Sequence, residues 1–407
     1  MKCRFCKTKL KHTFVNLGVS PLANSYIKED QLYNAEPFYP LHAYVCDNCF
    51  LVQLAEFENP RHIFGDYAYF SSYSESLLNH AKNYTRLMVD RFGFDRDSLV
   101  VEVASNDGYL LQYFKEMGVP ILGIEPAENV AKVAQDAGIP TIGMFFGTET
   151  AQELASEEKH ADLMIGNNVL AHVPDLNDFV AGFRILLKPR GIVTMEFPHL
   201  LQLMEDNLFD TIYHEHFSYF SFTTVQKVFA ENSLTLFDVQ EIPTHGGSLR
   251  IYACHSSDES RMPSDNVRGL LEREKKFGLT DLQPYLSYGP KVRQAKLSIL
   301  NFFIQEKAKR RIIAGYGAPA KGNTLLNYCG IGTDLVEYTV DRSPHKQAHY
   351  LPGSRIPIYP PDRVAETKPD YLVILPWNLK EEIMNQMSHI RQWGGKFVVL
   401  IPEVKVY

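Results

Sequence analysis

Several kinds of segment are scarce in this chain of 407 residues, and each scarcity excludes a class of protein. No apolar run reaches the ~20 residues needed to cross a bilayer, so no membrane span is expected. No charged and then apolar leader opens the sequence, which predicts a cytoplasmic protein. Long basic runs are also missing and the net charge is −7. This charge argues against nucleic acid as a partner.

Cysteine is sparse as well, with six residues in the whole chain. Four of them form two C-x-x-C pairs: Cys3 and Cys6 in "CRFC", and Cys46 and Cys49 in "CDNC". Four thiolates are the tetrahedral ligand set that structural zinc prefers, and they leave no position for catalysis. Disulfides fit a leaderless chain poorly, and a redox dithiol normally begins a helix in a βαβ unit. The isolated Cys254 and Cys329 are expected to be buried thiols.

Strands that alternate with helices dominate the rest of the sequence, which predicts an α/β protein with doubly wound parallel sheets. After about residue 93 the pattern yields five strands with intervening helices, and "TLFDVQEIP" and "GSLRIYACH" supply two closing strands. A second, smaller α/β unit begins at "RIIAGYG". The predicted parts are a zinc module (1–65), a Rossmann-like methyltransferase domain (66–255), a helical connector (256–310) and a C-terminal Rossmann-like domain (311–407).

The first strand–helix turn of the larger unit, "EVASNDG", lacks the G-x-G-x-x-G dinucleotide fingerprint. Glu125 ends the next strand, where a carboxylate can accept both ribose hydroxyls and would repel a 2′-phosphate. This pattern suits S-adenosylmethionine better than NAD, although Glu125 could also be a solvated loop carboxylate. Asn167 and Asn168 follow the fourth strand, as cofactor ligands or as helix caps. The candidate cofactor-binding residues are Glu102, Ala104, Asn106, Gly108, Glu125, Pro126, Asn167 and Asn168.

The segment "IYHEHFSYFS" gathers two histidines, a glutamate and several aromatic rings into ten residues. His214 and His216 are two residues apart, which is not the i, i+4 spacing of a helical zinc site. Adjacent side chains diverge in an extended segment, so one of the two histidines should face away from a cleft. The segment can supply a general base and hydrogen-bond donors, the groups that proton abstraction next to a ketone requires.

In the smaller unit, "GYGAPAKGNT" follows a strand and opens a helix. Its glycines allow backbone amides to approach an anion, and Lys321 adds positive charge. One interpretation is a site for the diphosphate of a sugar nucleotide. The alternative is a true dinucleotide site in a bifunctional enzyme, since Asp341 ends the next strand as a ribose-binding acid would.

Seven motifs occur in one order: "CRFC…CDNC", "DYAYFSSYS", "EVASNDGYLL", "GIEPAENVA", "NNVLAHVPDLNDFV", "YHEHFSYFS" and "GYGAPAKGNT". Over almost its whole length the chain resembles the nucleotide-sugar C-methyltransferases of deoxysugar biosynthesis. The resemblance implies a zinc module, a methyltransferase domain and a C-terminal domain that holds the nucleotide sugar. It implies C-3 methylation of a 4-keto-6-deoxysugar, typically linked to dTDP. Ala104 and Asn106 stand where methyltransferases in general often have glycine.

The resemblance also implies roles for particular residues. His216, the second histidine of its motif, would be the base, with Tyr213 as a donor to the enolate oxygen and Glu215 orienting or recharging an imidazole. His172 and Tyr67 match the other active-site positions, although in isolation either would more often be a core residue. His245, in "THGGS", is a weaker candidate near the sugar. The implied substrate-binding residues are Lys321, Gly322, Asn323 and Thr324.

Three functions remain open on the sequence. The leading hypothesis is an S-adenosylmethionine-dependent C-methyltransferase that acts through an enolate. The second is an O- or N-methyltransferase of the same architecture, acting on a sugar or another small polar substrate. The third is a non-catalytic module that kept the cofactor fold, against which the intact "YHEHFSY" argues. The expected assembly is a monomer or a weak homodimer.

Overall fold

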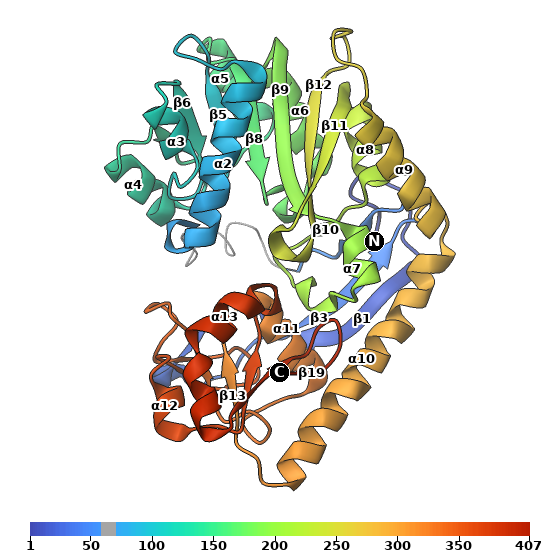
Figure 1. The fold of residues 1–407 in the computed structure, drawn as a ribbon. Helices are drawn as coiled ribbons and strands as arrows, with labels where there is room; N and C mark the ends of the chain where they lie inside the picture. The colour runs from blue at the N-terminus through green and yellow to red at the C-terminus, as the bar shows by residue number, and fades with distance from the viewer. Residues whose placement is uncertain (58–70) are drawn as a thin grey trace.

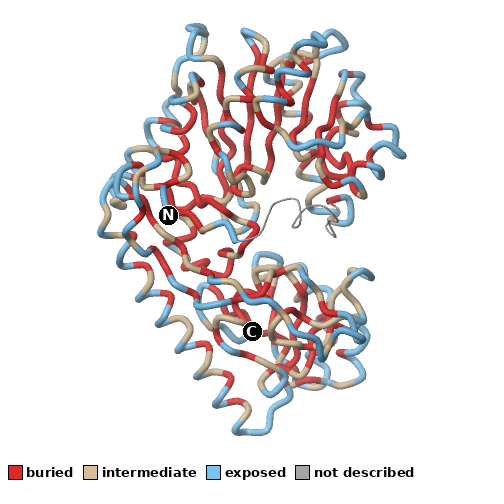
Figure 2. Tube along the Cα trace, turned by 180° about the vertical axis from the view of Figure 1, so that it is seen from behind, coloured by how far each residue is buried: buried red, intermediate tan, exposed pale blue. Residues whose placement is uncertain are grey.

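The computed structural model describes residues 1–57 and 71–407. Its two large sheets lie at opposite ends of the molecule, with the N-terminal strands and a long helix running between them (Figure 1). Strands of both sheets are buried along most of their length (Figure 2). Within the described residues, no helix has the length and apolar character needed to cross a membrane.

The N-terminal strands form an antiparallel sheet that the central domain completes. The strand order is β1-β3-β4-β10, and β10 comes from the histidine-rich segment more than 160 residues after β4. Ser218 pairs with Gln53 and Tyr219 with Val52. The smaller strand β2 pairs with β15 of the C-terminal domain. The strands are β1 (His12–Ser20), β2 (Ile27–Lys28), β3 (Tyr39–Val45), β4 (Val52–Leu54), β10 (Ser218–Tyr219) and β15 (His349–Tyr350).

The central sheet has seven strands in the order β11-β12-β9-β8-β5-β6-β7. Strands β9, β8, β5, β6 and β7 are mutually parallel, whereas β12 runs antiparallel to both of its neighbours. Strand β5 is buried at every position, as expected for a parallel strand covered by helices on both faces. The strands are β5 (Val100–Val103), β6 (Ile121–Ile124), β7 (Thr141–Ile142), β8 (Ala161–Asn167), β9 (Leu187–Pro198), β11 (Leu234–Ile242) and β12 (Ser248–His255).

Helices of the central domain begin and end at recognisable caps. The hydroxyl of Ser74 accepts a hydrogen bond from the Leu77 amide at the start of α2, and Gly93 ends α2 in the left-handed region at φ 72°. The third predicted strand is shorter than expected, because only Thr141–Ile142 pairs with β6 at the sheet edge. The helices are α2 (Glu75–Phe92), α3 (Leu111–Glu116), α4 (Glu128–Asp136), α5 (Thr148–Ser156), α6 (Leu176–Leu186), α7 (Leu200–Glu205) and α8 (Phe222–Glu231).

Two helices lead from the central domain to the C-terminal domain (Figure 1): α9 (Asp265–Phe277) and α10 (Gln283–Ala308). The carboxylate of Glu274 on α9 caps α8 by accepting hydrogen bonds from the Phe222 and Thr223 amides. Helix α10 begins at Gln283, within the predicted helical connector, and contains Pro290. It packs against β1 and then reaches the C-terminal domain.

The C-terminal sheet has six strands in the order β16-β14-β13-β17-β18-β19, all parallel except β19. One apolar core joins residues of β1, β3 and β4, helices α7, α10 and α11, and this sheet. The N-terminal strands therefore share their core with both larger domains. The elements are β13 (Ile313–Tyr316), β14 (Thr339–Val340), β16 (Ile358–Tyr359), β17 (Tyr371–Ile374), β18 (Lys396–Val399), β19 (Lys405–Val406), α11 (Ala320–Cys329), α12 (Arg363–Thr367) and α13 (Lys380–Gln386).

Candidate active site

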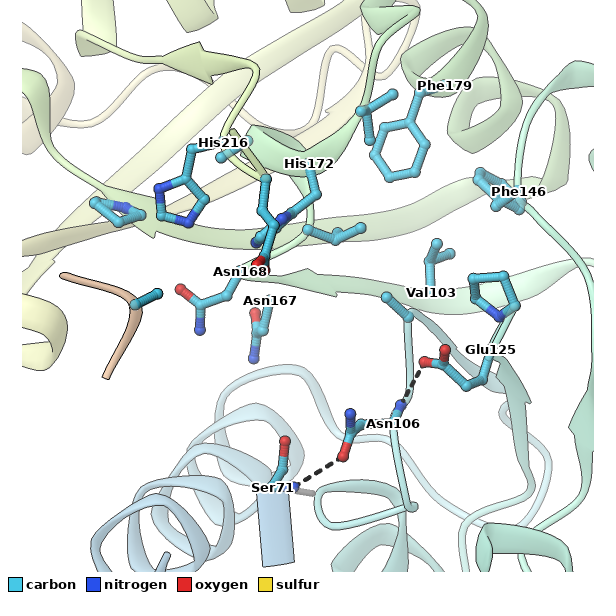
Figure 3. A pocket seen from close by; sticks show the side chains of 18 of the residues that line it. Ser71, Val103, Asn106, Glu125, Phe146, Asn167, Asn168, His172, Phe179 and His216 are labelled. Carbon is cyan, nitrogen blue, oxygen red and sulfur yellow. Dashed lines mark hydrogen bonds between the residues drawn. The ribbon is translucent and has the colours of Figure 1, made fainter. Parts of the chain in front are cut away.

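A cavity of about 600 Å³ lies at the carboxyl ends of β5, β6 and β8. Its walls come from all three parts of the chain, since Asn24 of the N-terminal strands and Lys321 of the C-terminal domain both line it. Ligands of open α/β sheets bind at this end of the strands. Figure 3 shows two groups of side chains in the cavity, one around Glu125 and one around His172 and His216.

The turn after β5 wraps around the carboxylate of Glu125. The backbone amide of Asn106 donates a 2.9 Å hydrogen bond to Oε2 (Figure 3). The backbone amide of Ala127 donates one of 2.8 Å to Oε1. The turn reaches this geometry with Ala104 at φ 56° and Asn106 at φ 51°, both in the left-handed region. These two residues adopt the conformation for which methyltransferase sequences commonly use glycine, and this accounts for the departure in the motif.

Burial raises the pKa of Glu125, and the two amide hydrogen bonds oppose that shift. Each oxygen holds one amide hydrogen and keeps lone-pair capacity toward the cavity, as ribose hydroxyls would require. Ala104, Asn106 and Pro126 line the cavity beside Glu125.

Two of the predicted cofactor residues lie outside the cavity lining. Glu102 is 1% exposed, and burial together with the Glu125 and Asp107 carboxylates raises its pKa well above the ordinary value. Gly108, at φ 80°, packs so closely that a Cβ atom would lie 2.8 Å from Cγ1 of Ile139. Both residues are packed within the turn and its neighbours, and neither lines the cavity.

Asn167 is the last residue of β8 and Asn168 follows it, and both line the cavity (Figure 3). Asn168 is in the left-handed region at φ 55°, and its backbone amide donates a 2.7 Å hydrogen bond to the backbone carbonyl of Glu196. The buried Oδ1 of Asn167 accepts no hydrogen bond from the described residues. A buried acceptor left unpaired is costly, so this atom is suited to an N–H or O–H group of a ligand.

An apolar wall near Glu125 was not anticipated from the sequence. Met144 and Phe145 line the cavity just after the short strand β7, and they are 37% and 42% exposed. Phe146 and Phe179 line it too, with their ring centroids 5.7 Å apart (Figure 3). Met144, Phe145 and Phe146 belong to "IPTIGMFF", the third of the five strands that the sequence pattern predicts. Rings and a thioether of this kind can pack against the planar base of a nucleoside.

The second group of side chains centres on His216. Its Nδ1 lies 3.0 Å from the carbonyl oxygen of Thr211. A carbonyl only accepts, so Nδ1 carries the hydrogen and Nε2 is the basic nitrogen. Burial lowers the pKa of His216 well below its ordinary value, and the neighbouring His172 adds to this effect. The ring of Tyr213 lies 4.1 Å from that of His216, and the ring of His172 lies 4.8 Å away, measured between centroids.

The two histidines of the motif face different surroundings because the chain turns between them, with the His216 backbone amide donating to the Tyr213 carbonyl at 2.9 Å. The expectation of an extended segment is wrong here, since residues two apart in such a segment would share a face. His214 does not line the cavity; its Nε2 lies 3.2 Å from the Pro40 carbonyl oxygen on the N-terminal sheet. Glu215 lines the cavity, and its Oε1 accepts a 2.7 Å hydrogen bond from Asn24. The hydrogen bond that fixes His216 comes from the Thr211 carbonyl, so the Glu215 carboxylate does not orient that imidazole. The backbone of Glu215 is hydrogen-bonded to the other imidazole, that of His172.

Burial shifts the pKa values of the remaining titratable groups near His216. It raises the pKa of Glu215 to about 7 and lowers that of His172 to about 4. His245 lines the cavity at φ 55°, and burial lowers its pKa to about 4. All three histidines of the cavity are thus held neutral at neutral pH. Tyr67, the other candidate, lies outside the described residues.

The C-terminal domain contributes Lys321 and Lys346 to the cavity. Nζ of Lys321 donates a 2.9 Å hydrogen bond to Oδ1 of Asn378 and lies 4.4 Å from the ring centroid of Trp377. Burial lowers the pKa of Lys321, and the carboxylate of Asp210 opposes this shift. Lys346 was not identified from the sequence; its Nζ donates to the Ala318 carbonyl at 3.0 Å.

The other three predicted substrate residues do not line the cavity. Gly322, Asn323 and Thr324 follow Lys321 in α11 and are buried against their own domain. A Cβ atom on Gly322 would lie 2.9 Å from Cβ of Leu375. Successive helical residues point in different directions, so a lysine at the helix start can face the cavity while its neighbours enter the core.

Asp341 is engaged by its own loop. Its Oδ2 accepts a 2.7 Å hydrogen bond from the Ala318 amide, and its Oδ1 accepts one of 2.9 Å from the Ser343 amide. Each oxygen therefore holds one amide hydrogen, the same arrangement as at Glu125, and this arrangement does not argue against a ribose-binding role. Asp341 itself does not line the cavity described above.

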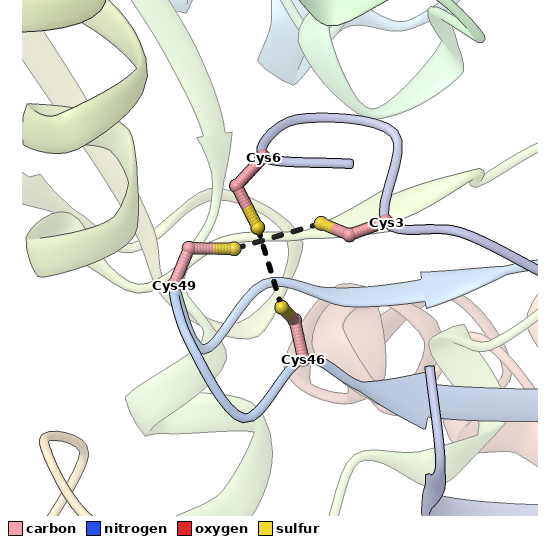
Figure 4. A group of neighbouring side chains, drawn as sticks. All are labelled: Cys3, Cys6, Cys46 and Cys49. Atoms are coloured by element: carbon pink, nitrogen blue, oxygen red, sulfur yellow. Dashed lines mark hydrogen bonds between the residues drawn. The ribbon is translucent and has the colours of Figure 1, made fainter. Parts of the chain in front are cut away.

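Outside the cavity lining, the four cysteines of the two C-x-x-C pairs converge (Figure 4). The sulfur atoms of Cys3 and Cys49 are 3.6 Å apart, those of Cys6 and Cys46 are 3.5 Å apart, and all four lie within 4.8 Å of one another. Tetrahedral zinc with Zn–S bonds of about 2.3 Å places its sulfurs about 3.8 Å apart. Nε2 of the buried Gln53 donates to the Cys3 sulfur, as an outer-shell partner would. The four residues fit a closed, structural zinc site.

Comparison with known proteins gives three family models along the chain. They are described as "Putative zinc binding domain" for residues 3–64, "Methyltransferase domain" for 77–239 and "C-methyltransferase C-terminal domain" for 243–402. The chain is also similar to C-methyltransferase NovU of Streptomyces niveus, with 35% identity over 406 residues, covering 100% of this chain and 96% of that protein. The chain belongs to this C-methyltransferase family.

Other matches are confined to part of the enzyme. A ubiquinone biosynthesis O-methyltransferase of Bartonella tribocorum is 27% identical over 128 residues, 28% of this chain and 52% of that protein. Among solved structures, magnesium protoporphyrin IX methyltransferase (ChlM) of Synechocystis PCC 6803 has 15% identity and a TM-score of 0.34, covering 48% of this chain and 89% of that one. The PH0226 protein of Pyrococcus horikoshii OT3 has 16% identity and a TM-score of 0.38, covering 49% and 99%.

Membership in the family confirms the main predictions from the sequence. The enzyme is an S-adenosylmethionine-dependent methyltransferase of the C-methyltransferase kind, with an N-terminal zinc-binding domain and Rossmann-like domains. The residues around Glu125 fit the cofactor: a carboxylate that can receive hydroxyls, the buried acceptor of Asn167 and an apolar wall at Phe145. When bound, S-adenosylmethionine supplies an electrophilic methyl group on sulfur.

Proposed function

We propose that the enzyme methylates C-3 of a nucleotide-linked 4-keto-6-deoxysugar, most simply a dTDP-sugar, through an enolate. The carrying observation is that His216 lines the cavity with Nδ1 bonded to the Thr211 carbonyl, so that Nε2 can accept a proton. The cavity lies at a sheet edge suited to the methyl donor and also has two lysines for an anionic substrate.

In the proposed reaction, Nε2 of His216 removes the proton from C-3 beside the C-4 ketone. The electron pair of the broken C–H bond moves toward the ketone oxygen and gives an enolate. Tyr213, which lines the cavity with its ring next to that of His216, is the proposed hydrogen-bond donor to that oxygen. The enolate carbon would then take the methyl group of the donor: the new C–C bond forms as the methyl–sulfur bond breaks, with its electron pair left on sulfur. The C-4 ketone is restored, and the proton removed from C-3 stays on Nε2 of His216.

The low pKa of His216 makes it a weak base in the absence of substrate. Burial is the main cause, and the positive charge of Lys321 contributes. A diphosphate bound near Lys321 would neutralise that charge, so we expect substrate binding to raise the pKa of His216 toward the working pH. The proposed substrate thereby improves the base that acts on it. His172 stands beside His216 and is proposed to pack its ring and to contact the sugar.

The proposed substrate-binding group is Lys321, joined by Lys346, at the wall formed by the C-terminal domain. Two ammonium groups suit the two phosphates of a nucleoside diphosphate. Nucleotide-linked sugars are cytoplasmic metabolites, and the enzyme is proposed to act in that compartment.

The test is incubation of the purified enzyme with a radiolabelled methyl donor and a panel of keto-sugar nucleotides. The expected product carries the label on C-3. A second measurement follows deuterium exchange at C-3 in D₂O without the methyl donor. Exchange distinguishes this reaction from O- or N-methylation, which needs no enolate. Transfer of label to oxygen or nitrogen, or transfer to carbon without any C-3 exchange in the wild type, would overturn the proposal.

A further inference from the structure

Asn24 is the one residue of the N-terminal strands, within the described chain, that lines the cavity. It lies between β1 and β2, and its Nδ2 donates a 2.7 Å hydrogen bond to Oε1 of Glu215. The sequence motif around Glu215 does not predict Asn24 as its hydrogen-bond partner, because Asn24 lies 191 positions earlier in the chain. The contact joins the zinc-binding domain directly to the segment that carries the proposed base.

Tyr26 lies next to Oδ1 of Asn24. Its phenolic hydroxyl has one hydrogen and two acceptors within reach, Oδ1 of Asn24 at 3.3 Å and the carbonyl oxygen of Ala318 at 2.6 Å. Ala318 belongs to the glycine-rich loop of the C-terminal domain, and Lys346 donates to the same carbonyl at 3.0 Å. A continuous set of polar contacts therefore runs from Glu215 through the zinc-binding domain to the wall that carries the two lysines.

The carboxyl group of Glu215 is 4% exposed and lines the cavity. Burial disfavours its charged form, whereas the amide hydrogen of Asn24 favours it, and the pKa settles at about 7. Tyr26 faces Glu215 from the N-terminal strands. The titratable groups that share the described cavity wall with Glu215 are Tyr109, Glu125, His172, Asp175, Asp178, Tyr213, His216, His245, Lys321 and Lys346.

We propose that Asn24 is a positioning residue: it holds Glu215 in the cavity as a carboxylate that accepts a hydrogen bond from a hydroxyl group of the sugar. The inference rests on the proposed function for the identity of that hydroxyl. It predicts that the zinc-binding domain contributes to substrate recognition through a side chain, in addition to the support it gives the fold. A protonated Glu215 would present a donor where the substrate needs an acceptor.

The first test needs no substrate. The enzyme is labelled with ¹³C at the glutamate carboxyl groups, Glu215 is assigned by its loss in Glu215→Gln, and its titration is followed by NMR. Asn24→Ala should raise the pKa of Glu215 by about one unit or more, since a hydrogen bond to a charged group contributes about 1.5–3 kcal/mol. Asn34→Ala, an exposed residue of the same domain, is the matched control and should leave the titration unchanged.

The second test separates positioning from general stability by kinetics. Asn24→Ala should raise KM for the sugar nucleotide about 10-fold or more and move the acidic limb of the kcat/KM profile to higher pH. Zinc content and the affinity for S-adenosylmethionine should stay at wild-type values. In the Glu215→Gln background, Asn24→Ala should add little, because the carboxylate through which it acts has gone.

Two outcomes would overturn the inference: full additivity of Asn24→Ala and Glu215→Gln, or an unchanged Glu215 titration in a zinc-loaded Asn24→Ala enzyme. If Asn24→Ala loses zinc or fails to fold, Tyr26→Phe replaces it, and the same shift in smaller degree is expected. Failure of the proposed function has a different signature. The wild-type enzyme would then leave every keto-sugar nucleotide unmethylated, while the NMR titration would still decide whether Asn24 controls Glu215.

Discussion

The indole Nε1–H of Trp377 donates a 2.7 Å hydrogen bond to Oδ2 of Asp210. Trp377 belongs to the C-terminal domain and lies under the Lys321 ammonium group, whereas Asp210 precedes Thr211, whose carbonyl fixes His216. Burial raises the pKa of Asp210 to about 6, and Lys321 opposes that shift. One indole thus links the proposed phosphate-binding lysine to the segment of the proposed base.

Lys321→Ala should raise KM for the sugar nucleotide and leave the affinity for S-adenosylmethionine nearly unchanged. Loss of a charge-assisted hydrogen bond of about 1.5–3 kcal/mol corresponds to an increase of about 10-fold to 150-fold. Steady-state kinetics and calorimetry measure the two quantities. Lys396→Ala removes an exposed lysine of the same domain and should change neither. Weaker binding of the methyl donor would give the C-terminal domain a different role.

Glu125→Ala should weaken S-adenosylmethionine binding about 10-fold to 150-fold, since the carboxylate is proposed to receive the ribose hydroxyls. The variant also frees the Asn106 and Ala127 amides, so the turn should be checked by thermal denaturation without ligand. Glu128→Ala, an exposed acid three residues further on, is the matched control for calorimetry. Wild-type affinity in Glu125→Ala would place the ribose partner elsewhere.

His216→Ala should abolish both methyl transfer and deuterium exchange at C-3, and exchange is the sharper measurement because it isolates proton removal. A positioned base contributes about 10² to 10⁴ in rate. Tyr213→Phe should slow exchange less, with His172→Asn between the two. His214→Asn is the matched control, since it alters the other histidine of the motif, which faces the Pro40 carbonyl. This variant should retain deuterium exchange at C-3. Exchange that survives His216→Ala at the wild-type rate would require another base.

Removal of one zinc ligand should disturb the active site indirectly. Cys46→Ser is expected to lose the metal and to destabilise the N-terminal sheet, because metal binding and folding are coupled. Strand β4 of that sheet pairs with β10, which begins two residues after His216. Disorder of the sheet should therefore displace the proposed base and lower kcat. Elemental analysis should give one zinc per chain for the wild type and for the control Cys329→Ser. Absence of zinc from the native enzyme would contradict the assignment.

Stability should fall in acid partly because of His172. Burial lowers its pKa from 6.5 to about 4, so the unfolded chain takes up this proton at a higher pH than the folded enzyme does. The resulting loss starts as the pH drops through 6.5 and is complete near pH 4, at about 3 kcal/mol. His172→Asn should therefore lose less stability than the wild type between pH 7 and pH 5 in denaturant titrations. The exposed His345→Asn should behave like the wild type.

Local patterns were enough to predict the α/β class, the zinc ligands and the methyltransferase family. Paired cysteines, alternating buried strands and the order of the motifs are properties of neighbouring residues, and the thiol geometry and the family comparison agree with them. The sequence also predicted different surroundings for His214 and His216, but the reason given was wrong, since residues two apart in an extended segment share a face. A turn, closed by the His216 backbone amide on the Tyr213 carbonyl, separates the two side chains.

Contacts between segments far apart in the sequence became known only from the tertiary structure. The partner of Glu215 is Asn24, 191 positions earlier, and the hydrogen bond on His216 comes from a backbone carbonyl, which no side-chain pattern encodes. Likewise, Lys321 faces the cavity while Gly322 to Thr324 turn into the core, since the direction of each helical side chain depends on how the helix packs. The amino-acid sequence specifies which chemical groups this enzyme has. The packing of its three parts specifies which of these groups lie within contact distance of one another.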